Sequence, residues 1–485
     1  MLIDTHCHLD FKDFDTDRDD VIDRAISKGA ARIINVGSSL EGTRRSLLLA
    51  KKYDIVYASV GIHPHEANSV TDDAISEIRE LAKEKKVVAI GEVGLDYYPV
   101  LIAASPLRYR ACSDEIKDIQ QAAFRRFIQL ALDLDLPLII HSREADVDII
   151  KILNEYAIRD TQYGRRTRGV IHCFSGGEDF LKECLGLGFY ISFTGNLTFK
   201  KAQALRDVAK IVPIERVLLE TDAPYLSPEP LRGKRNEPAY LEYLVAEWVR
   251  LTGLSKEDIE RITTHNANDL FKLNLREGDS RISYEIRDSL YLNITNECTN
   301  NCYFCVRART SFVKGHNLRL DKEPSVEEIL KATVDAKRYK EVVFCGYGEP
   351  TKRLDAVKAV ARWVKGSSFA KASADRQAPR VRLITNGHGD LINGRPIAKE
   401  LVGLVDKVSV SLNTDKEDLY YKACKPVFGH DAYKAVIKFI RDCAANGIKT
   451  EVTCLNLPGV DLGECERIAK NLGASFRART YGVTG

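Results

Sequence analysis

Short β-branched runs alternate with helix-length amphipathic stretches along nearly the whole sequence. Over residues 1–272 the apolar runs are Met1–His8, Arg32–Gly37, Val56–His63, Val87–Asp96, Pro137–Arg143, Gly169–Ser175, Phe189–Gly195 and Val217–Asp222. Stretches such as Thr16–Gly29, Glu115–Leu134 and Lys200–Ile211 have the length and pattern of helices. Eight such units predict an α/β fold, a closed (β/α)8 TIM-type barrel. An open doubly wound sheet is the alternative, but eight units favour closure.

The alternation resumes in the second half of the chain. The polar stretch Asn274–Ser289 suggests a linker over residues 273–289, between a domain at 1–272 and a domain at 290–485. Six further strands are expected at Leu290–Thr295, Glu341–Gly346, Val381–Gly387, Lys407–Asn413, Lys449–Asn456 and Phe476–Tyr481. Six units predict a partial (β/α)6 barrel. A chain of 485 residues is also too long for a single hydrophobic core.

Two segments interrupt this rhythm. Val100–Cys112 lengthens the loop after the fourth expected strand, and Ser367–Gln377 is a small-residue stretch of low complexity. Both are expected to be surface insertions without a function of their own. The first follows a strand with candidate metal ligands, so it would bear on substrate preference.

The composition limits where the protein works and what it binds. The net charge of +3 comes from 72 basic and 69 acidic residues, so any contact with nucleic acid needs a local patch rather than a global field. No apolar run is long enough to span a membrane, and the start MLIDTHCHLD does not resemble a secretory signal. We therefore expect a cytoplasmic protein whose 12 cysteines include metal ligands rather than a disulfide framework.

Histidines and carboxylates gather at the ends of the strands expected in the first domain. They are His6, His8, Glu92, Asp96, His141, His172, Glu220 and Asp222. In a barrel these ends converge on one face, and alternate residues of a strand, such as His6 and His8, point to the same side. A single histidine at a strand end is more often a hydrogen-bonded residue than a ligand. The combination indicates a site for divalent ions such as zinc, manganese or magnesium.

The order and spacing of these motifs resemble those of a known enzyme family. The segments DTHCHLDF, VGIHPH, GEVGLDYY, LPLIIHSREA, HCFSGG, ISFTGN, LLETDAPYLSP and RGKRNEPAYL are similar to the motif series of the TatD family of metal-dependent deoxyribonucleases. The resemblance covers about residues 1–272. It implies a barrel enzyme that holds two divalent ions and cleaves phosphodiester bonds, with DNA as the expected substrate and RNA as a further one.

The resemblance also implies roles for individual residues. His6, His8 and Asp222 would hold one ion, His141 and His172 the second, and Glu92 would bridge them. Glu92 and Asp222 would be the catalytic carboxylates, with Asp222 positioning or deprotonating the attacking water. Substrate contacts are expected at three basic residues, His63, Arg143 and Arg235.

Other functions are compatible with the same ligands. Barrels of this kind also cleave esters and amides, so an aminoacyl-tRNA deacylase or a small amidohydrolase is an alternative to a 3′-to-5′ DNA exonuclease. In a further alternative, the barrel only recruits nucleic acid for the second domain. The complete set of ligand types favours an enzyme.

Three cysteines follow the first expected strand of the second domain. Cys298, Cys302 and Cys305 have the spacing C-x3-C-x2-C. Three thiolates on a [4Fe–4S] cluster leave one iron open, whereas a cluster that only transfers electrons normally has four protein ligands. A zinc knuckle is the alternative, but the nearest histidine, His316, does not have finger-like spacing. The remaining cysteines of this half, Cys345, Cys424, Cys443, Cys454 and Cys465, are expected to be buried thiols.

This cysteine motif resembles that of the radical SAM superfamily, over about residues 285–485. In that superfamily the open iron binds S-adenosyl-L-methionine, whose reductive cleavage yields a 5′-deoxyadenosyl radical. The resemblance implies that Gly346, Gly348 and Glu349 contact the methionine amino group. It places Asn386, Ser411 and Asn413 near the ribose, and it implies an electron donor such as flavodoxin or ferredoxin. Neither the radical substrate nor the oligomeric state follows from the sequence.

Overall fold

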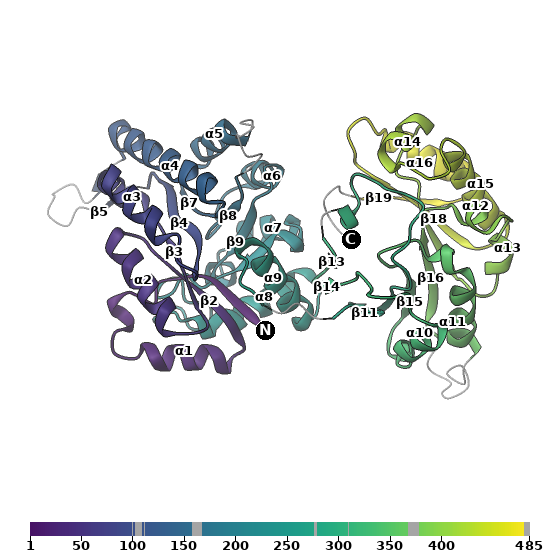
Figure 1. Ribbon diagram of the computed structural model, residues 1–485, viewed down its shortest axis with the longest axis horizontal. Coiled ribbons are helices and arrows are strands. Elements are labelled where there is room, and N and C mark those ends of the chain that lie inside the picture. Colours follow the sequence, from purple (N-terminus) through teal and green to yellow (C-terminus); the bar gives the residue numbers. More distant parts are fainter. Residues whose placement is uncertain are drawn as a thin grey trace. The chain divides into compact units, whose positions relative to one another are not determined.

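A computed structural model of the chain describes residues 1–98, 100–101, 109–110, 112–157, 167–275, 279–308, 310–366 and 378–479. The chain divides into two compact units, Met1–Arg276 and Glu277–Gly485 (Figure 1). The domain limits expected at residues 272 and 290 remain predictions. The insertion expected at 367–377, and most of Val100–Cys112, lie outside the described residues. The described ends of the latter, β5 (Val100–Leu101) and β6 (Tyr109–Arg110), pair as an antiparallel ribbon.

The first unit contains the predicted barrel. Its eight parallel strands are β1 (Leu2–Cys7), β2 (Ala30–Val36), β3 (Val56–Val60), β4 (Val87–Asp96), β7 (Leu138–Arg143), β8 (Gly169–Ile171), β9 (Tyr190–Phe193) and β10 (Val217–Leu219), which neighbour one another in this order. A parallel bridge between Cys7 and Ala223 joins the two ends of the sheet, so the barrel is nearly closed. The prediction of a closed α/β barrel is confirmed.

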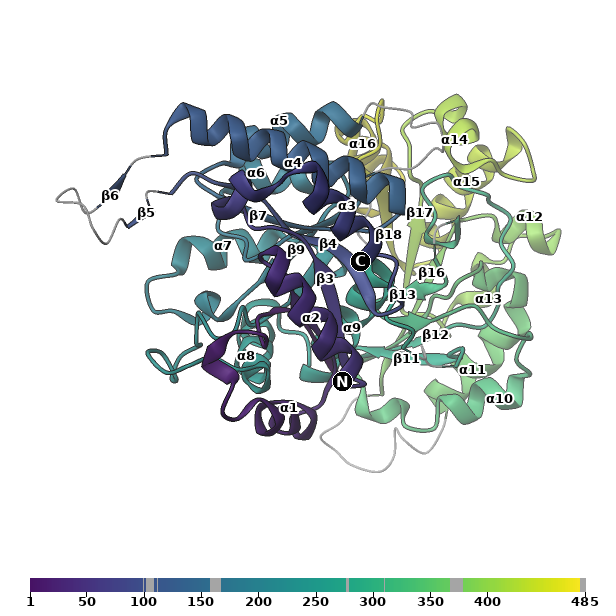
Figure 2. The same cartoon turned by 60° about the vertical axis from the view of Figure 1, so that its left-hand side comes forward.

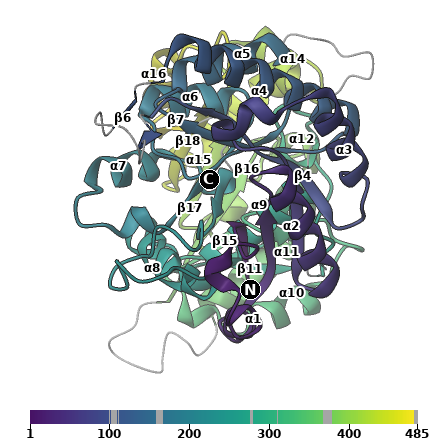
Figure 3. The same ribbon diagram turned by 90° about the vertical axis from the view of Figure 1, so that its left-hand side faces the viewer.

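Helices surround these strands (Figure 3). They are α1 (Arg18–Ser27), α2 (Leu40–Lys52), α3 (Asp72–Leu81), α4 (Asp114–Leu134), α5 (Asp146–Ala157), α6 (Glu178–Gly186), α7 (Gln203–Ile211), α8 (Leu241–Thr252) and α9 (Lys256–Phe271). The local sequence sets where they begin and end. Ser113 caps α4 by accepting the amide of Ile116, and Asp135 ends that helix in the left-handed conformation.

The strand that carries Glu92 is buried along its whole length. All ten residues of β4 are buried. Continuous burial is typical of a parallel strand covered on both sides. The core between strands and helices includes Phe124, Phe193 and Trp248, and a smaller cluster joins the strands to Phe271 at the end of α9. The barrel is therefore a packed scaffold whose rim positions the polar residues described below.

The second unit is built on a seven-stranded sheet. Its strands are β11 (Ser283–Ile286), β12 (Ser289–Leu292), β15 (Glu341–Phe344), β16 (Arg380–Thr385), β17 (Lys407–Ser411), β18 (Lys449–Leu455) and β19 (Ser475–Arg479). The six from β12 to β19 run parallel, as predicted for a partial barrel. Strand β11 pairs with β12 in the antiparallel direction, so part of the segment expected to be a linker belongs to the sheet.

Helices cover one side of this sheet (Figure 2). The helices of the unit are α10 (Val326–Ala332), α11 (Leu354–Gly366), α12 (Gly389–Asn393), α13 (Ala398–Leu401), α14 (Glu417–Cys424), α15 (Asp431–Ala445) and α16 (Leu462–Asn471). A two-residue ribbon, β13 (Phe312–Val313) with β14 (His316–Asn317), follows the cysteine motif. The unit has its own core, which includes Phe344, Tyr420 and Phe439. No helix among the described residues has the length and apolar character needed to cross a membrane.

Candidate metal centre and cluster site

Closure of the barrel brings the first three candidate ligands together. His6 lies in β1, His8 follows it, and Asp222 follows β10. The Asp222 amide donates to the His6 carbonyl at 2.8 Å, and the His8 amide donates to the Ala223 carbonyl, also at 2.8 Å. The pairing that joins the two ends of the sheet thus also sets the spacing of these side chains.

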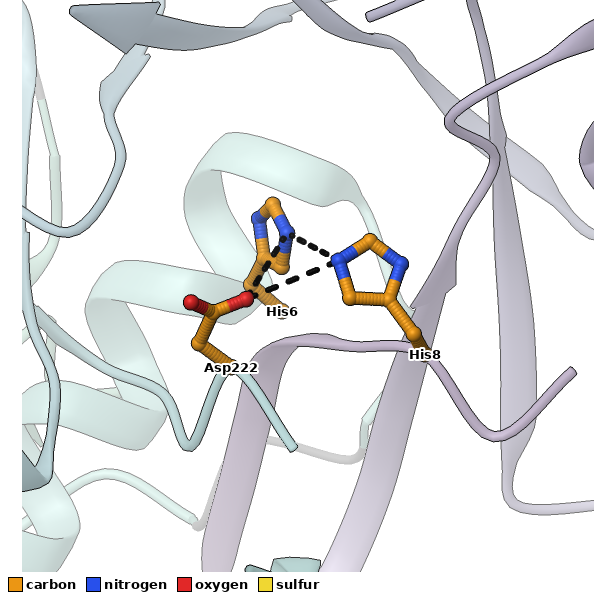
Figure 4. A group of neighbouring side chains, drawn as sticks. All are labelled: His6, His8 and Asp222. Atoms are coloured by element: carbon orange, nitrogen blue, oxygen red, sulfur yellow. Dashed lines mark hydrogen bonds and ion pairs between the residues drawn. The ribbon is translucent and has the colours of Figure 1, made fainter. Parts of the chain in front are cut away.

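The nitrogen and oxygen atoms of this group point toward one another (Figure 4). The Nε2 atoms of His6 and His8 are 3.2 Å apart, and Asp222 Oδ1 lies 3.7 Å and 3.5 Å from them. His8 Nδ1 is 3.1 Å from the Val36 carbonyl, to which it donates, and the other ring nitrogen, Nε2, faces the group. Asp222 has a φ of 55°, a left-handed conformation that aspartate tolerates better than most residues.

Glu92 lies between two sets of histidines. Its Oε2 atom is 3.5 Å from His6 Nε2 and 3.9 Å from His8 Nε2. Its Oε1 atom is 2.7 Å from His141 Nδ1 and 3.1 Å from His172 Nε2. One carboxylate therefore faces the His6–His8 pair with one oxygen and the His141–His172 pair with the other. The six residues of the sequence prediction meet in one place, although their roles as ligands remain predictions.

The electrostatics of the site favour ionised carboxylates among histidines. Burial would raise the pKa of Glu92, but the nearby charge of His172 and hydrogen bonds from His141 and His172 hold it well below its usual value. Burial would also raise the pKa of Asp222, but a hydrogen bond from His8 outweighs this effect and lowers that pKa. Desolvation lowers the pKa of His6. Burial also opposes the positive charge of His172, but Glu92 and Glu220 raise its pKa well above the usual value.

Two further carboxylates hold the second pair of histidines from behind. Asp96 Oδ2 is 3.1 Å from His141 Nε2, and Glu220 Oε1 is 3.3 Å from His172 Nδ1. The Glu220 oxygen also accepts the Cys173 amide at 2.6 Å. A carboxylate on the far nitrogen fixes the tautomer of a ligating histidine. The sequence places both residues at strand ends, but no role was predicted for either.

Gly94 allows the strands that carry Glu92 and His141 to approach closely. A Cβ atom at Gly94 would lie 2.1 Å from the His141 carbonyl oxygen, and its φ is +141°. No other residue fits this position without moving β4 away from β7. Gly94 therefore lets β4 and β7 come close enough for the side chains of Glu92 and Asp96 to contact His141.

The three predicted substrate contacts lie in different surroundings. His63 Nδ1 accepts the His65 amide at 3.2 Å, and its Nε2 is 3.7 Å from Glu92 Oε1, at the edge of the site. Arg143 is exposed, with its guanidinium 3.8 Å from the centre of the Tyr98 ring. Arg235 is engaged with Asp17 through bonds of 2.8 and 2.6 Å. Burial lowers the pKa of His63 to about 3, which leaves a neutral ring with its proton on Nε2.

The donor set fits divalent ions. The ligand atoms of His6, His8 and Asp222 all lie within 4.8 Å of one another. Imidazole nitrogens and carboxylate oxygens are the ligands that zinc and manganese accept. The donor atoms of His6, His8 and Asp222 therefore fit one ion, and a second ion on His141 and His172 with Glu92 as the bridge remains a prediction.

In the second unit the cysteine motif lies in the loop that follows β12. The amides of Asn301 and Tyr303 donate to the carbonyls of Cys424 and Ala423 at 2.9 and 3.2 Å. These carbonyls belong to the last residues of α14, where helices leave acceptors unsatisfied. The end of α14 thus holds the loop through its backbone. The Cys424 side chain also contacts Cys302.

The three cysteines of the motif carry free thiols. Cys298, Cys302 and Cys305 are half-buried, and burial raises the pKa of the Cys298 thiol to about 11. Within the described part of the chain, their sulfurs do not form a group whose ligand atoms all lie within 4.8 Å. Thiolates are the usual ligands of iron–sulfur clusters, and the binding of a cluster by these three cysteines remains a prediction.

The glycine–glutamate turn after β15 packs against the start of the cysteine loop. A Cβ atom at Gly348 would lie 2.3 Å from the Glu297 carbonyl, and one at Gly346 would lie 2.3 Å from Asn293 Oδ1. Glu349 is buried, and its Oε2 atom accepts the Asn386 amide at 2.7 Å. The carboxylate therefore ties this turn to β16. The predicted contact of these three residues with a methionine amino group remains a prediction.

The three residues expected near a ribose end the next two strands. Asn386 Nδ2 donates to Thr299 Oγ1 at 2.9 Å and lies 3.8 Å from Cys298 Sγ, so it adjoins the cysteine motif. Ser411 is half-buried at the end of β17. Asn413 has a φ of 65°, and its Nδ2 is 3.7 Å from the Cys424 sulfur. Their contact with a cofactor also remains a prediction.

Fold and site together define a barrel with the donor set of a metal-dependent hydrolase, followed by a partial barrel with a three-cysteine loop. The model of the TatD related DNase family matches residues 3–272, and that of the radical SAM superfamily matches residues 292–472. The chain belongs to the TatD family and carries a radical SAM domain in its second half. Membership implies divalent metals for the first unit and an iron–sulfur cluster with S-adenosyl-L-methionine for the second.

Several curated relatives match the first unit. The metal-dependent hydrolase YabD of Bacillus subtilis is 41% identical over 274 residues, which are 56% of this chain and all of that protein. YcfH of Escherichia coli is 38% identical, over 56% of this chain and 96% of that protein. A protein of Cronobacter turicensis named 3′-5′ ssDNA/RNA exonuclease TatD is 34% identical, over 56% of this chain and 98% of that protein.

Among solved structures, the TatD homologue YjjV of Escherichia coli is 30% identical, with a TM-score of 0.49 over 56% of this chain and 98% of that one. A TatD family hydrolase of Entamoeba histolytica is 24% identical, with a TM-score of 0.48 over 56% of this chain and 97% of that one.

Proposed function

We propose that the first unit is a phosphodiesterase that removes nucleotides from the 3′ end of DNA with two divalent ions, and that RNA is a further substrate. The observation that carries the proposal is the position of Glu92. Its two oxygens face different pairs of histidines at 3.5 Å and 2.7 Å, as a carboxylate between two ions requires. The name of the Cronobacter relative supports nucleic acid as the substrate class.

Ions held by His6, His8 and Asp222, and by His141 and His172, would lower the pKa of water and polarise phosphoryl oxygens. The protein side chains supply position and proton transfer. Asp222 directs Oδ1 toward both histidines and turns Oδ2 away from them, which leaves Oδ2 to accept a proton from the attacking water (Figure 4). The neutral ring of His63, with its proton on Nε2, supports a hydrogen bond to a phosphate oxygen.

We propose that Cys298, Cys302 and Cys305 hold a [4Fe–4S] cluster, which would reduce S-adenosyl-L-methionine with electrons from a donor such as flavodoxin or ferredoxin. The glycine–glutamate turn and Asn386 adjoin the cysteine loop, which supports a cofactor beside them. The substrate of this unit is left open.

The first test is hydrolysis of single-stranded DNA that carries a label at its 3′ end, with manganese or magnesium, by the wild type and the Glu92→Gln variant. Glutamine keeps the size of the side chain but removes the charge that both histidine pairs face. We expect the variant to lose at least about 3 kcal/mol of transition-state stabilisation, roughly a hundredfold in rate.

Glu84→Gln is the matched control, because Glu84 is an exposed residue of the same unit that pairs with Lys51. Equal rates for the wild type and Glu92→Gln would contradict the proposal. A wild type that ignores DNA but deacylates aminoacyl-tRNA, or cleaves a small amide, would assign the barrel to that chemistry. Binding of DNA with no hydrolysis of any of these substrates would indicate a recruiting module.

A further inference from the structure

A histidine outside the proposed ligand set lies at the edge of the metal centre. His65 belongs to the short 3-10 segment Pro64–Ser69, directly after β3. Its ring is 4.6 Å from that of His63, which in turn is 4.5 Å from that of His141. His65 is therefore one imidazole ring away from the centre. Its side chain is 42% exposed, so a substrate can reach it.

A buried carboxylate fixes the orientation of the His65 ring. His65 Nε2 is 3.0 Å from Asp96 Oδ2, and the Asp96 side chain is 1% exposed. The other oxygen, Oδ1, accepts the Tyr98 amide at 3.0 Å, so the carboxylate cannot rotate freely. Because Nε2 carries the hydrogen that bonds Asp96, Nδ1 is the nitrogen directed away from the carboxylate.

The surroundings distinguish His65 from a metal ligand. His63, His65 and Asp96 have ligand atoms within 4.8 Å of one another, as a third ion would need. However, His63 Nδ1 already accepts the His65 amide, which leaves the His63 proton on Nε2 and no lone pair there for an ion. Asp96 Oδ2 also lies 3.1 Å from His141 Nε2, but His65 is the exposed ring on this buried carboxylate, and an exposed imidazole held by a carboxylate can act as an acid or a base.

We propose that His65, held by Asp96, is the general acid that protonates the leaving oxygen during phosphodiester cleavage. The inference rests on the proposed phosphodiesterase function. Water attacks phosphorus and loses a proton to Asp222, and the bond from phosphorus to the leaving 3′ oxygen breaks. The electron pair of that bond stays on the oxygen, which takes the proton of His65 Nδ1. Solvent then returns a proton to His65 and removes the proton that Asp222 took from the water, while Asp96 stabilises the imidazolium form of His65 before each transfer.

Leaving-group chemistry gives the sharpest test. A 3′ alkoxide needs a proton, whereas nitrophenolate is stable without one. We expect His65→Ala to lower kcat on single-stranded DNA by about a hundredfold or more, within the range of general acid catalysis. The same variant should cleave the p-nitrophenyl ester of thymidine 5′-monophosphate at the wild-type rate, and added imidazole should restore part of the activity on DNA.

The matched control is Glu66→Ala, an exposed neighbour in the same segment, which should cleave both substrates like the wild type. Manganese bound per chain, measured by equilibrium dialysis, should be equal in the wild type and His65→Ala. An equal loss of activity on both substrates, no loss on DNA, or one ion fewer in the variant would overturn the role of His65. A wild type that cleaves neither substrate would instead overturn the proposed function, and the inference with it.

Discussion

A buried carboxylate, Glu220, lies next to the His172 ring. Glu220 is 1% exposed, and one of its oxygens lies near His172 Nδ1 while it accepts the amide of Cys173. This contact leaves the other nitrogen, Nε2, directed at Glu92. Because a ring that rotates loses its ligand geometry, a buried carboxylate of this kind controls ion affinity without touching the ion.

Replacing that carboxylate should weaken ion binding. We expect Glu220→Gln to lower manganese affinity by about 10–100-fold. The neutral amide cannot accept hydrogen bonds and orient the His172 ring in the same way as the carboxylate. Equilibrium dialysis measures the change. Glu178→Gln, at an exposed glutamate of α6 that pairs with Lys182, should bind manganese like the wild type. Unchanged affinity in Glu220→Gln would show that His172 is oriented by packing alone.

Individual residues also show what the sequence could predict of the site. The pattern His6-Cys7-His8 indicated two rings on one side of a strand, and the structure brings them together. The same spacing occurs in His63-Pro64-His65, yet no role for His65 was predicted. Pro64 and the turn after β3 remove the simple alternation of a strand, so only the folded chain shows that His65 meets Asp96.

At the scale of the element, helix α14 holds the cysteine loop through side chains as well as through its last carbonyls. Tyr420 is 1% exposed, and its hydroxyl accepts Asn300 Nδ2 at 3.2 Å and lies 2.9 Å from His388 Nε2. The far nitrogen of His388 contacts Thr299, next to the first cysteine. Burial lowers the pKa of His388 to about 4, so the ring is neutral and links two hydroxyl groups.

Removal of the Tyr420 hydroxyl should loosen this loop. Tyr420→Phe leaves buried polar groups of Asn300 and His388 without a partner, which costs about 1–3 kcal/mol. We expect a lower free energy of unfolding for the second unit and faster loss of iron to a chelator. Denaturant titration and iron release measure the two effects.

The neighbouring tyrosine provides the control for this variant. Tyr421 is 43% exposed and stacks on His430, so Tyr421→Phe should release iron at the wild-type rate. Equal iron release from the two variants would mean that the Tyr420 hydroxyl does not support the loop.

The strands of both units could be predicted because apolar runs and their spacing reveal parallel strands. Strand β4, Val87–Asp96, has the predicted limits. Strand β11 was missed, since Ser283–Ile286 is polar and short and only one of its residues is buried. Its formation depends on the partner β12, and pairing with a neighbour leaves little trace in a four-residue sequence.

At the scale of the whole molecule, the two units have separate cores and separate sites. The candidate ligands of the hydrolase all lie within Met1–Arg276, and the three cysteines lie within Glu277–Gly485. A triple substitution of Cys298, Cys302 and Cys305 by serine should therefore abolish iron binding but leave DNA hydrolysis at the wild-type rate. Iron analysis and the 3′-label assay measure the two functions. A parallel loss of hydrolysis would show that the units are coupled.

The join between the first and last strands of the barrel has a mechanical meaning. Thr5 and Leu219, which are hydrogen-bonded across it, are 214 residues apart in the sequence. His6 and His8 stand on one side of the join and Asp222 on the other. A ligand that binds residues on both sides therefore closes a long loop of the chain. The first and last strands cannot separate there until that ligand dissociates. Substrate or cofactor bound at this place would lengthen the lifetime of the folded chain. Local separation of the first and last strands would destroy the site before the rest of the barrel unfolds.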